Sequence, residues 1–152
     1  MMKHTSFIRL LLMAFLHFLA MYVLMYAMVY KFIDVYPNLN QLYMAGIMTA
    51  PMLILEILFM GVMYKNLTKN VLMCISIFIF ILFLIFIRKQ TAIDNKQFLK
   101  SMIPHHSGAI LMCKNASFDD LEIKQLCQKI IPSQQSEIDQ MKQILERLGK
   151  KD

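Results

Sequence analysis

The sequence lacks the short patterns on which most enzymes depend. It has only four glycines, and none of them form a loop that could hold a phosphate group. No nucleophile stands in a recognisable arrangement with a general base, and the Glu-x-x-His pairs of di-iron helical bundles are missing. We therefore expect a protein that is not an enzyme and has no catalytic residues.

Acidic residues are also scarce, with ten Asp and Glu against sixteen Lys and Arg, which gives a net charge of +6. The basic residues lie mostly at the ends of apolar stretches and in the C-terminal tail, where membrane proteins usually carry them. No basic patch is interleaved with aromatic residues, as a nucleic-acid-binding surface would require. The positive charge therefore indicates contact with lipid headgroups, and we expect no nucleic-acid partner.

Apolar residues, in contrast, make up 58% of the chain. Three apolar stretches cover residues 7–30, 42–64 and 71–87. A membrane span needs about 20 mostly apolar residues, and Leu67 and Lys69 can lengthen the third stretch because a lysine side chain can reach back to the interface. No small-x-small cleavage pattern follows the first stretch, so we expect it to be retained as an anchor. The sequence predicts a transmembrane domain of three helices over residues 1–90.

Residues 91–152 form the second predicted domain, a small helical hairpin, so that the whole fold is expected to be all-α. Asp94 can cap the first helix of this hairpin, which should run to about Asn115. Pro104 falls inside that helix and is expected to kink it, because proline removes a backbone donor.

A capping box and a terminal glycine mark the second helix of the hairpin. Asp119 followed by Glu122 has the spacing of such a box, with Asp in place of the usual Ser or Thr. We expect the helix to run from there to about Leu148, with an interruption at Pro132 and an end at Gly149. Two helices of this size make a poor core on their own. The hairpin should therefore pack against the membrane part or pair with a second copy.

Metal-capable side chains crowd into the first helix of the hairpin. At about 100° per residue, its histidines, two methionines and a cysteine fall on one side. The second helix offers a glutamate and a methionine one turn apart. We expect the two faces to meet in an interface that contains Met102, His105, His106, Met112, Cys113, Gln134, Glu137 and Met141.

This donor set predicts copper as the first candidate metal. Imidazole suits copper, zinc or iron, whereas thioether and thiolate favour Cu(I). His105 and His106 lie about 100° apart on a helix, so one can bind a metal while the other orients it or pairs with Glu137. The same residues also allow a structural interpretation, in which the methionines fill a core and the histidines are hydrogen-bonded within it.

Two groups of tail residues carry a resemblance to a known family. They are Met102-Ile103-Pro104-His105-His106-x-Gly108-Ala109-Ile110-x-Met112 and Gln134-x-x-Glu137-Ile138-x-x-Met141. Together they resemble the family catalogued as domain of unknown function family 305, over about residues 94–148. The resemblance implies half of a ferritin-like four-helix bundle, located outside the cytoplasm and associated with copper binding and copper tolerance. The ligands it implies are Met102, His105, His106, Met112 and Met141, with Glu137 as their partner.

The cysteines and the basic residues leave two questions open. Cys113 and Cys127 could form a disulfide in an oxidising compartment, but nothing in the sequence fixes the required geometry. Lys and Arg counts near the helix ends do not decide which side of the membrane holds the tail. The resemblance implies that the N-terminus is cytoplasmic and the tail periplasmic or extracellular, in a bacterial inner membrane.

Two ionisable residues, His17 and Glu56, lie within the predicted spans, where such residues are costly and usually face a bundle interior. They could form a hydrogen bond that ties the first two spans together. Each also belongs to a ladder of methionines four residues apart, which could instead form a path for Cu(I). Gly46 and its alanine neighbours allow close approach between helices.

These observations together predict a membrane-anchored Cu(I)-binding protein that buffers copper or confers copper tolerance at the outer face of the inner membrane. The expected partners are the lipid bilayer, a second copy joined through the hairpin, and a copper-handling protein. The alternative is a non-catalytic interaction or assembly protein whose histidines are structural.

Overall fold

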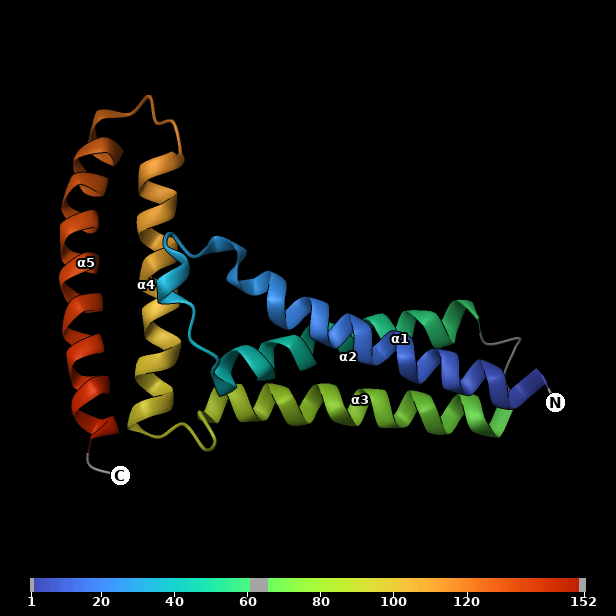
Figure 1. Cartoon of the computed structure of the whole chain (residues 1–152). Coiled ribbons are helices and arrows are strands. Elements are labelled where there is room, and N and C mark those ends of the chain that lie inside the picture. Colours follow the sequence, from blue (N-terminus) through green and yellow to red (C-terminus); the bar gives the residue numbers. More distant parts are fainter. Residues whose placement is uncertain (1, 61–65, 151–152) are drawn as a thin grey trace. The chain divides into compact units, whose positions relative to one another are not determined.

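The computed structural model describes residues 2–60 and 66–150, and this part of the chain is all-α with no strand, as predicted (Figure 1). The elements are α1 (Met2–Leu24), the 3₁₀ turns η1 (Met25–Met28) and η2 (Phe32–Asp34), α2 (Leu39–Phe59), α3 (Asn66–Lys89), α4 (Asn95–Asn115) and α5 (Leu121–Gly149). The chain divides into two compact units. The first holds α1, α2 and α3, and the second holds the segment Tyr26–Leu39 together with α4 and α5.

The first unit contains three helices that are long and apolar enough to cross a membrane. These candidate spans are Phe7–Met28, Leu39–Phe59 and Asn66–Lys89. Many large apolar side chains on these helices are exposed. Phe15 and Phe78, for example, are 62% and 65% exposed. Such exposure is favourable in lipid and costly in water. The three predicted spans are therefore present, as in a multi-pass membrane protein.

Close packing between α2 and α3 depends on a glycine. A Cβ atom placed on Gly46 would lie only 2.6 Å from Cδ2 of Phe83. Ala45 and Ala50 on the same helix are almost fully buried. The predicted close approach at these small residues is confirmed, since a larger side chain at Gly46 would collide with the Phe83 ring.

One expectation for the first unit is met and another needs correction. Because α3 begins at Asn66, Leu67 and Lys69 lengthen the third span as expected; residues 61–65, with the expected end of the second span, lie outside the described residues. Within the described residues no hydrogen bond joins His17 to Glu56. His17 instead lines an open cavity of about 450 Å³ together with Met52, which lies one helical turn before Glu56.

In the second unit, α4 and α5 lie side by side as the predicted hairpin (Figure 1). Its core is formed by Ile103, Ile110 and Ile138, all less than 2% exposed. Asp94 caps α4 as predicted, and its carboxylate accepts a 2.7 Å hydrogen bond from the Gln97 amide. The hairpin thus begins where the sequence indicated and closes over a small aliphatic core.

The start of α5 and its expected interruption both differ from prediction. The N-cap is Asp120 and not Asp119, since the Asp120 carboxylate accepts hydrogen bonds from the amides of Glu122 and Ile123. With two consecutive aspartates, the one that reaches these free amides becomes the cap. The expected interruption at Pro132 is wrong, because α5 runs through it without a break. Proline removes one backbone donor, and the other turns of α5 still hold the helix.

A disulfide joins Cys113 near the end of α4 to Cys127 near the start of α5, with a Cα–Cα distance of 5.2 Å. It closes a loop with a sequence separation of 14 residues. The sequence alone did not decide whether this disulfide forms. In this form Cys113 has no thiolate to offer a metal.

The segment Tyr26–Leu39 docks on α4 at several points. The side-chain amide of Asn38 donates to the carbonyl of Lys100 at 3.3 Å, and the Leu39 amide donates to Oε1 of Gln97 at 2.9 Å. A Cβ atom on Gly108 would lie 3.3 Å from the carbonyl oxygen of Met28. The segment that joins α1 to α2 therefore also covers one side of α4.

Candidate metal site

His106 faces α5 and contacts a carboxylate. Its side chain is buried, with 8% of the residue exposed, and Nδ1 lies 3.1 Å from Oε2 of Glu137. The two atoms are close but not aligned as a hydrogen bond, so Nδ1 has no hydrogen-bond partner although it is buried. The other carboxylate oxygen of Glu137 accepts a 3.1 Å hydrogen bond from Ser133. Glu137, whose side chain is 47% exposed, thus lies beside the imidazole and is held there by one exposed hydrogen bond.

The surroundings of His106 favour its neutral form. Burial lowers its pKa below the ordinary value of 6.5, and the opposing attraction of Glu137 is smaller. The neighbouring His105 lowers this pKa slightly further. Neutral imidazole is the form that binds metals, because one ring nitrogen then keeps its lone pair.

His105 and Met112 do not lie in the α4–α5 interface, contrary to prediction. Both are exposed, Met112 to 52%. The reason is angular: α5 packs on the side of Ile103 and Ile110, at about 100° and 80° when Met102 defines zero. His105 and Met112 then lie at about −60° and −80°, well away from that side. The predicted face was too wide for one neighbouring helix to cover.

The remaining predicted residues are divided between the hairpin interface and the surface. Met141 is partly buried and packs on the cluster of Ile103, Ile110 and Ile138. Met102 and Gln134 are partly exposed. Across residues 2–60 and 66–150, no group of three or more His, Cys, Asp or Glu residues lies close enough to hold a metal. A site built within one copy would therefore need methionine thioethers beside the histidines.

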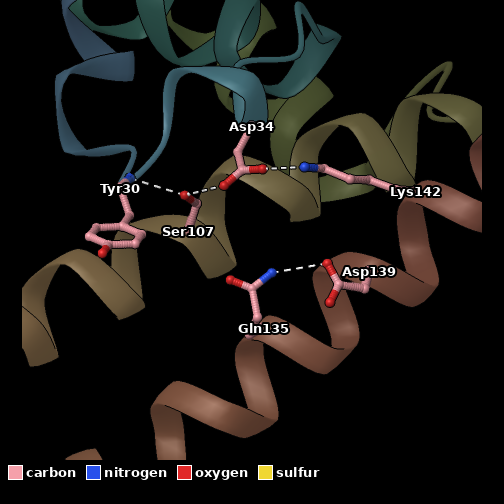
Figure 2. Close-up of polar contacts among 6 residues, drawn as sticks. All are labelled: Tyr30, Asp34, Ser107, Gln135, Asp139 and Lys142. Carbon is pink, nitrogen blue, oxygen red and sulfur yellow. Dashed lines mark hydrogen bonds and ion pairs between the residues drawn. The ribbon is translucent and has the colours of Figure 1, made fainter.

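A buried polar cluster next to the histidines was not predicted (Figure 2). Asp34, only 2% exposed, accepts a 2.8 Å hydrogen bond from the Ser107 hydroxyl and forms an ion pair with Lys142 of α5. Ser107 is fully buried, and its oxygen accepts a 3.0 Å hydrogen bond from the Tyr30 amide. These contacts fasten the Tyr26–Leu39 segment to both helices of the hairpin.

The sequence carried only a weak signal for this cluster. Asp34 is the one acidic residue between Lys31 and Gln41, where a lone carboxylate is an ordinary loop residue. Ser107 follows directly after His106 and lies about 100° further round the helix, where it faces Asp34 and not Glu137. Nothing in the pattern indicated that the loop covers that side of α4.

Comparison with known proteins assigns the tail to a family. Residues 87–145 match the family described as Domain of unknown function (DUF305). The chain is also similar to "Uncharacterized protein L153" of Acanthamoeba polyphaga mimivirus, with 42% identity over 116 residues, which cover 74% of each chain. This protein belongs to the DUF305 family. No solved structure matches.

The DUF305 match covers every residue predicted as a ligand, and it leaves out the Tyr26–Leu39 segment that docks on α4. The similarity to the viral relative is longer. Because fewer than 116 residues lie on either side of the start of α4, that similarity must include part of the apolar region as well as part of the hairpin. Part of each region is therefore shared between the two chains.

Proposed function

We propose that this DUF305 protein is a membrane-anchored Cu(I)-binding protein that buffers copper or contributes to copper tolerance. The observation that carries the proposal is the contact between His106 and Glu137. Metal-binding histidines commonly present one ring nitrogen to a carboxylate while the other binds the metal. In the described chain no hydrogen bond occupies Nε2 of His106, so this nitrogen would be the ligand.

The chemistry of the nearby donors suits copper. Met102 lies one helical turn before His106 and three residues before His105, so its thioether is a neighbour of both on α4. Thioether and imidazole together favour Cu(I). A zinc site of the usual kind would need several His, Cys or carboxylate ligands, and the described residues do not bring three of them together.

A second copy would complete the donor set. An exposed or partly exposed stripe runs along α4 with alternating steps of four and three residues, formed by Phe98, Met102, His105, Ala109 and Met112. This spacing is typical of a helix that packs against a partner helix. Two hairpins joined through this stripe would form a four-helix bundle with His105 and Met112 of both copies inside it.

The disulfide supports an extracytoplasmic location for the hairpin. Such bonds persist in oxidising compartments and are rare in the cytosol. We therefore propose that the N-terminus is cytoplasmic and the hairpin lies on the outer side, where a copper-handling protein could exchange the metal. A bacterial inner membrane stays the predicted location, although the relative described above is a viral protein.

The test is Cu(I) titration of the full-length protein against a chromophoric Cu(I) chelator. We expect His106→Ala to lose tight binding and Glu137→Gln to weaken it by about 10- to 100-fold, the usual cost of removing an orienting partner. Asp139→Asn is the matched control, because it removes an exposed carboxylate of α5 that is not among the predicted ligands. Equal affinity of the wild type, His106→Ala and Glu137→Gln would contradict the proposal.

The alternative is a non-catalytic interaction or assembly protein with structural histidines. In that case the contact with Glu137 would only accommodate a buried imidazole. Purification without added metal separates the two. A metal-free native protein that crosslinks to a membrane partner would favour assembly, whereas bound copper would favour the proposal above.

A further inference from the structure

The 3₁₀ turn η2 presents an apolar pair that nothing in the described chain covers. Phe32 is 91% exposed and Ile33 is 73% exposed. The next residue, Asp34, is 2% exposed and points the opposite way, into the hairpin. The turn is thus amphipathic, with two large apolar side chains outside and a buried carboxylate inside.

The position of this pair along the chain places it near the bilayer surface. The first candidate span ends at Met28 and α2 begins at Leu39. An extended chain covers at most about 3.5 Å per residue, so Phe32 lies within about 14 Å of the end of the first span. The interfacial layer of a bilayer extends about 5–8 Å beyond each face of the hydrocarbon core. Phe32 and Ile33 are therefore within reach of that layer.

We propose that Phe32 and Ile33 insert into the interfacial layer of the membrane that α1 and α2 cross. The occupant of this apolar surface is lipid, because the pair is tethered on both sides to spans that lipid already surrounds. The adjacent Lys31 is exposed and can meet the phosphate of a headgroup. Phe and Leu side chains are common on the apolar faces of segments that lie in the membrane interface.

Insertion of this pair would also position the hairpin. Asp34 joins the turn to Ser107 of α4 and to Lys142 of α5. A turn held in the headgroup layer therefore keeps the part of the hairpin around Ser107 and Lys142 close to the membrane surface. This inference does not depend on metal binding.

The test uses the absence of tryptophan from the natural chain. Phe32→Trp introduces one fluorophore at an exposed site, and Ile33→Trp is a second variant in case the first folds poorly. Leu121→Trp is the matched control, because Leu121 is 68% exposed at the start of α5 in the same unit. Phe15→Trp, in the first span, gives the signal of a lipid-surrounded residue. Each full-length variant is reconstituted in vesicles with or without lipid brominated near the headgroup end of its acyl chains.

We expect bromolipid to quench the Phe32→Trp and Ile33→Trp variants by a fraction comparable to that of Phe15→Trp, with blue-shifted emission. The Leu121→Trp variant should keep its full emission. Quenching of neither η2 variant would overturn the proposal. So would a blue shift at η2 that depends on protein concentration and not on bromolipid, because a second copy would then cover the pair.

Discussion

Replacing Asp34 by Asn should release the Tyr26–Leu39 segment from the hairpin. The substitution keeps the size of the side chain and an oxygen that can accept from Ser107, but it removes the charge opposite Lys142. The Lys142 ammonium, whose side chain is 25% exposed, would then lack its carboxylate partner. We expect the segment to open more often while α4 and α5 stay folded.

The free-energy cost of Asp34→Asn depends on how deeply the ion pair with Lys142 is buried. Removing one member of a fully buried ion pair costs about 3–5 kcal/mol. Because Lys142 keeps some contact with water, we expect the lower part of that range or slightly less, about 2–3 kcal/mol. This corresponds to roughly a 30- to 150-fold rise in the open population. Asp139→Asn is the control, since Asp139 is exposed and its hydrogen bond to Gln135 stays within α5 (Figure 2).

The amide of Tyr30 provides a direct assay, because it donates to the Ser107 oxygen that Asp34 holds. Hydrogen exchange of the peptide that contains Tyr30 gives the free energy of opening in the full-length protein. A cycle of Asp34→Asn, Lys142→Met and the double variant should give a coupling energy of about 1–3 kcal/mol. Additive effects of the two substitutions would refute the reasoning, because the pair would then contribute no energy of its own.

Two further predictions concern the hairpin itself. The folded state lowers the pKa of His106, so below about pH 6.5 the unfolded state binds more protons, and the metal-free protein should lose stability as the pH falls through this window. Thermal unfolding at several pH values should show this slope in the wild type and in a His105→Gln control but not in His106→Gln; an unchanged slope in His106→Gln would contradict the assignment. Replacing Cys113 and Cys127 together by Ser should cost about 3 kcal/mol, as expected for opening a loop of about 15 residues. Hydrogen exchange in α4 and α5 checks this, and no change after reduction by dithiothreitol would count against it.

The parts of the fold that the sequence predicted well depend on local composition. The three spans follow from the length of the apolar stretches, and the start of α4 follows from the carboxylate of Asp94. Errors arose where two local signals compete, as at Asp119 and Asp120, where only the geometry of the first turn selects the cap. The interruption expected at Pro132 was wrong, because a proline need not break a helix and α5 is continuous there.

The candidate site was predicted only in part. Helical periodicity gives the direction of each side chain around α4, but it does not show how much of that surface α5 covers. The contact of His106 with Glu137 was among the arrangements expected, whereas the exposure of His105 and Met112 was not. The docking of Asp34 could not be predicted from pattern. Its partners lie 73 and 108 residues further along the chain.

Three consecutive residues of α4 meet three different surroundings, and this limits what their sequence motif can mean. His105 faces outward, His106 faces Glu137 of α5, and Ser107 faces the docked segment. Steps of about 100° make such a division unavoidable on a helix. Gly108 belongs to the docking side, because any Cβ there would approach the Met28 carbonyl. The short motif therefore serves packing as well as the proposed metal site. A substitution at Ser107 or Gly108 that weakened copper binding would act by displacing α4, whereas one at His106 would remove a donor.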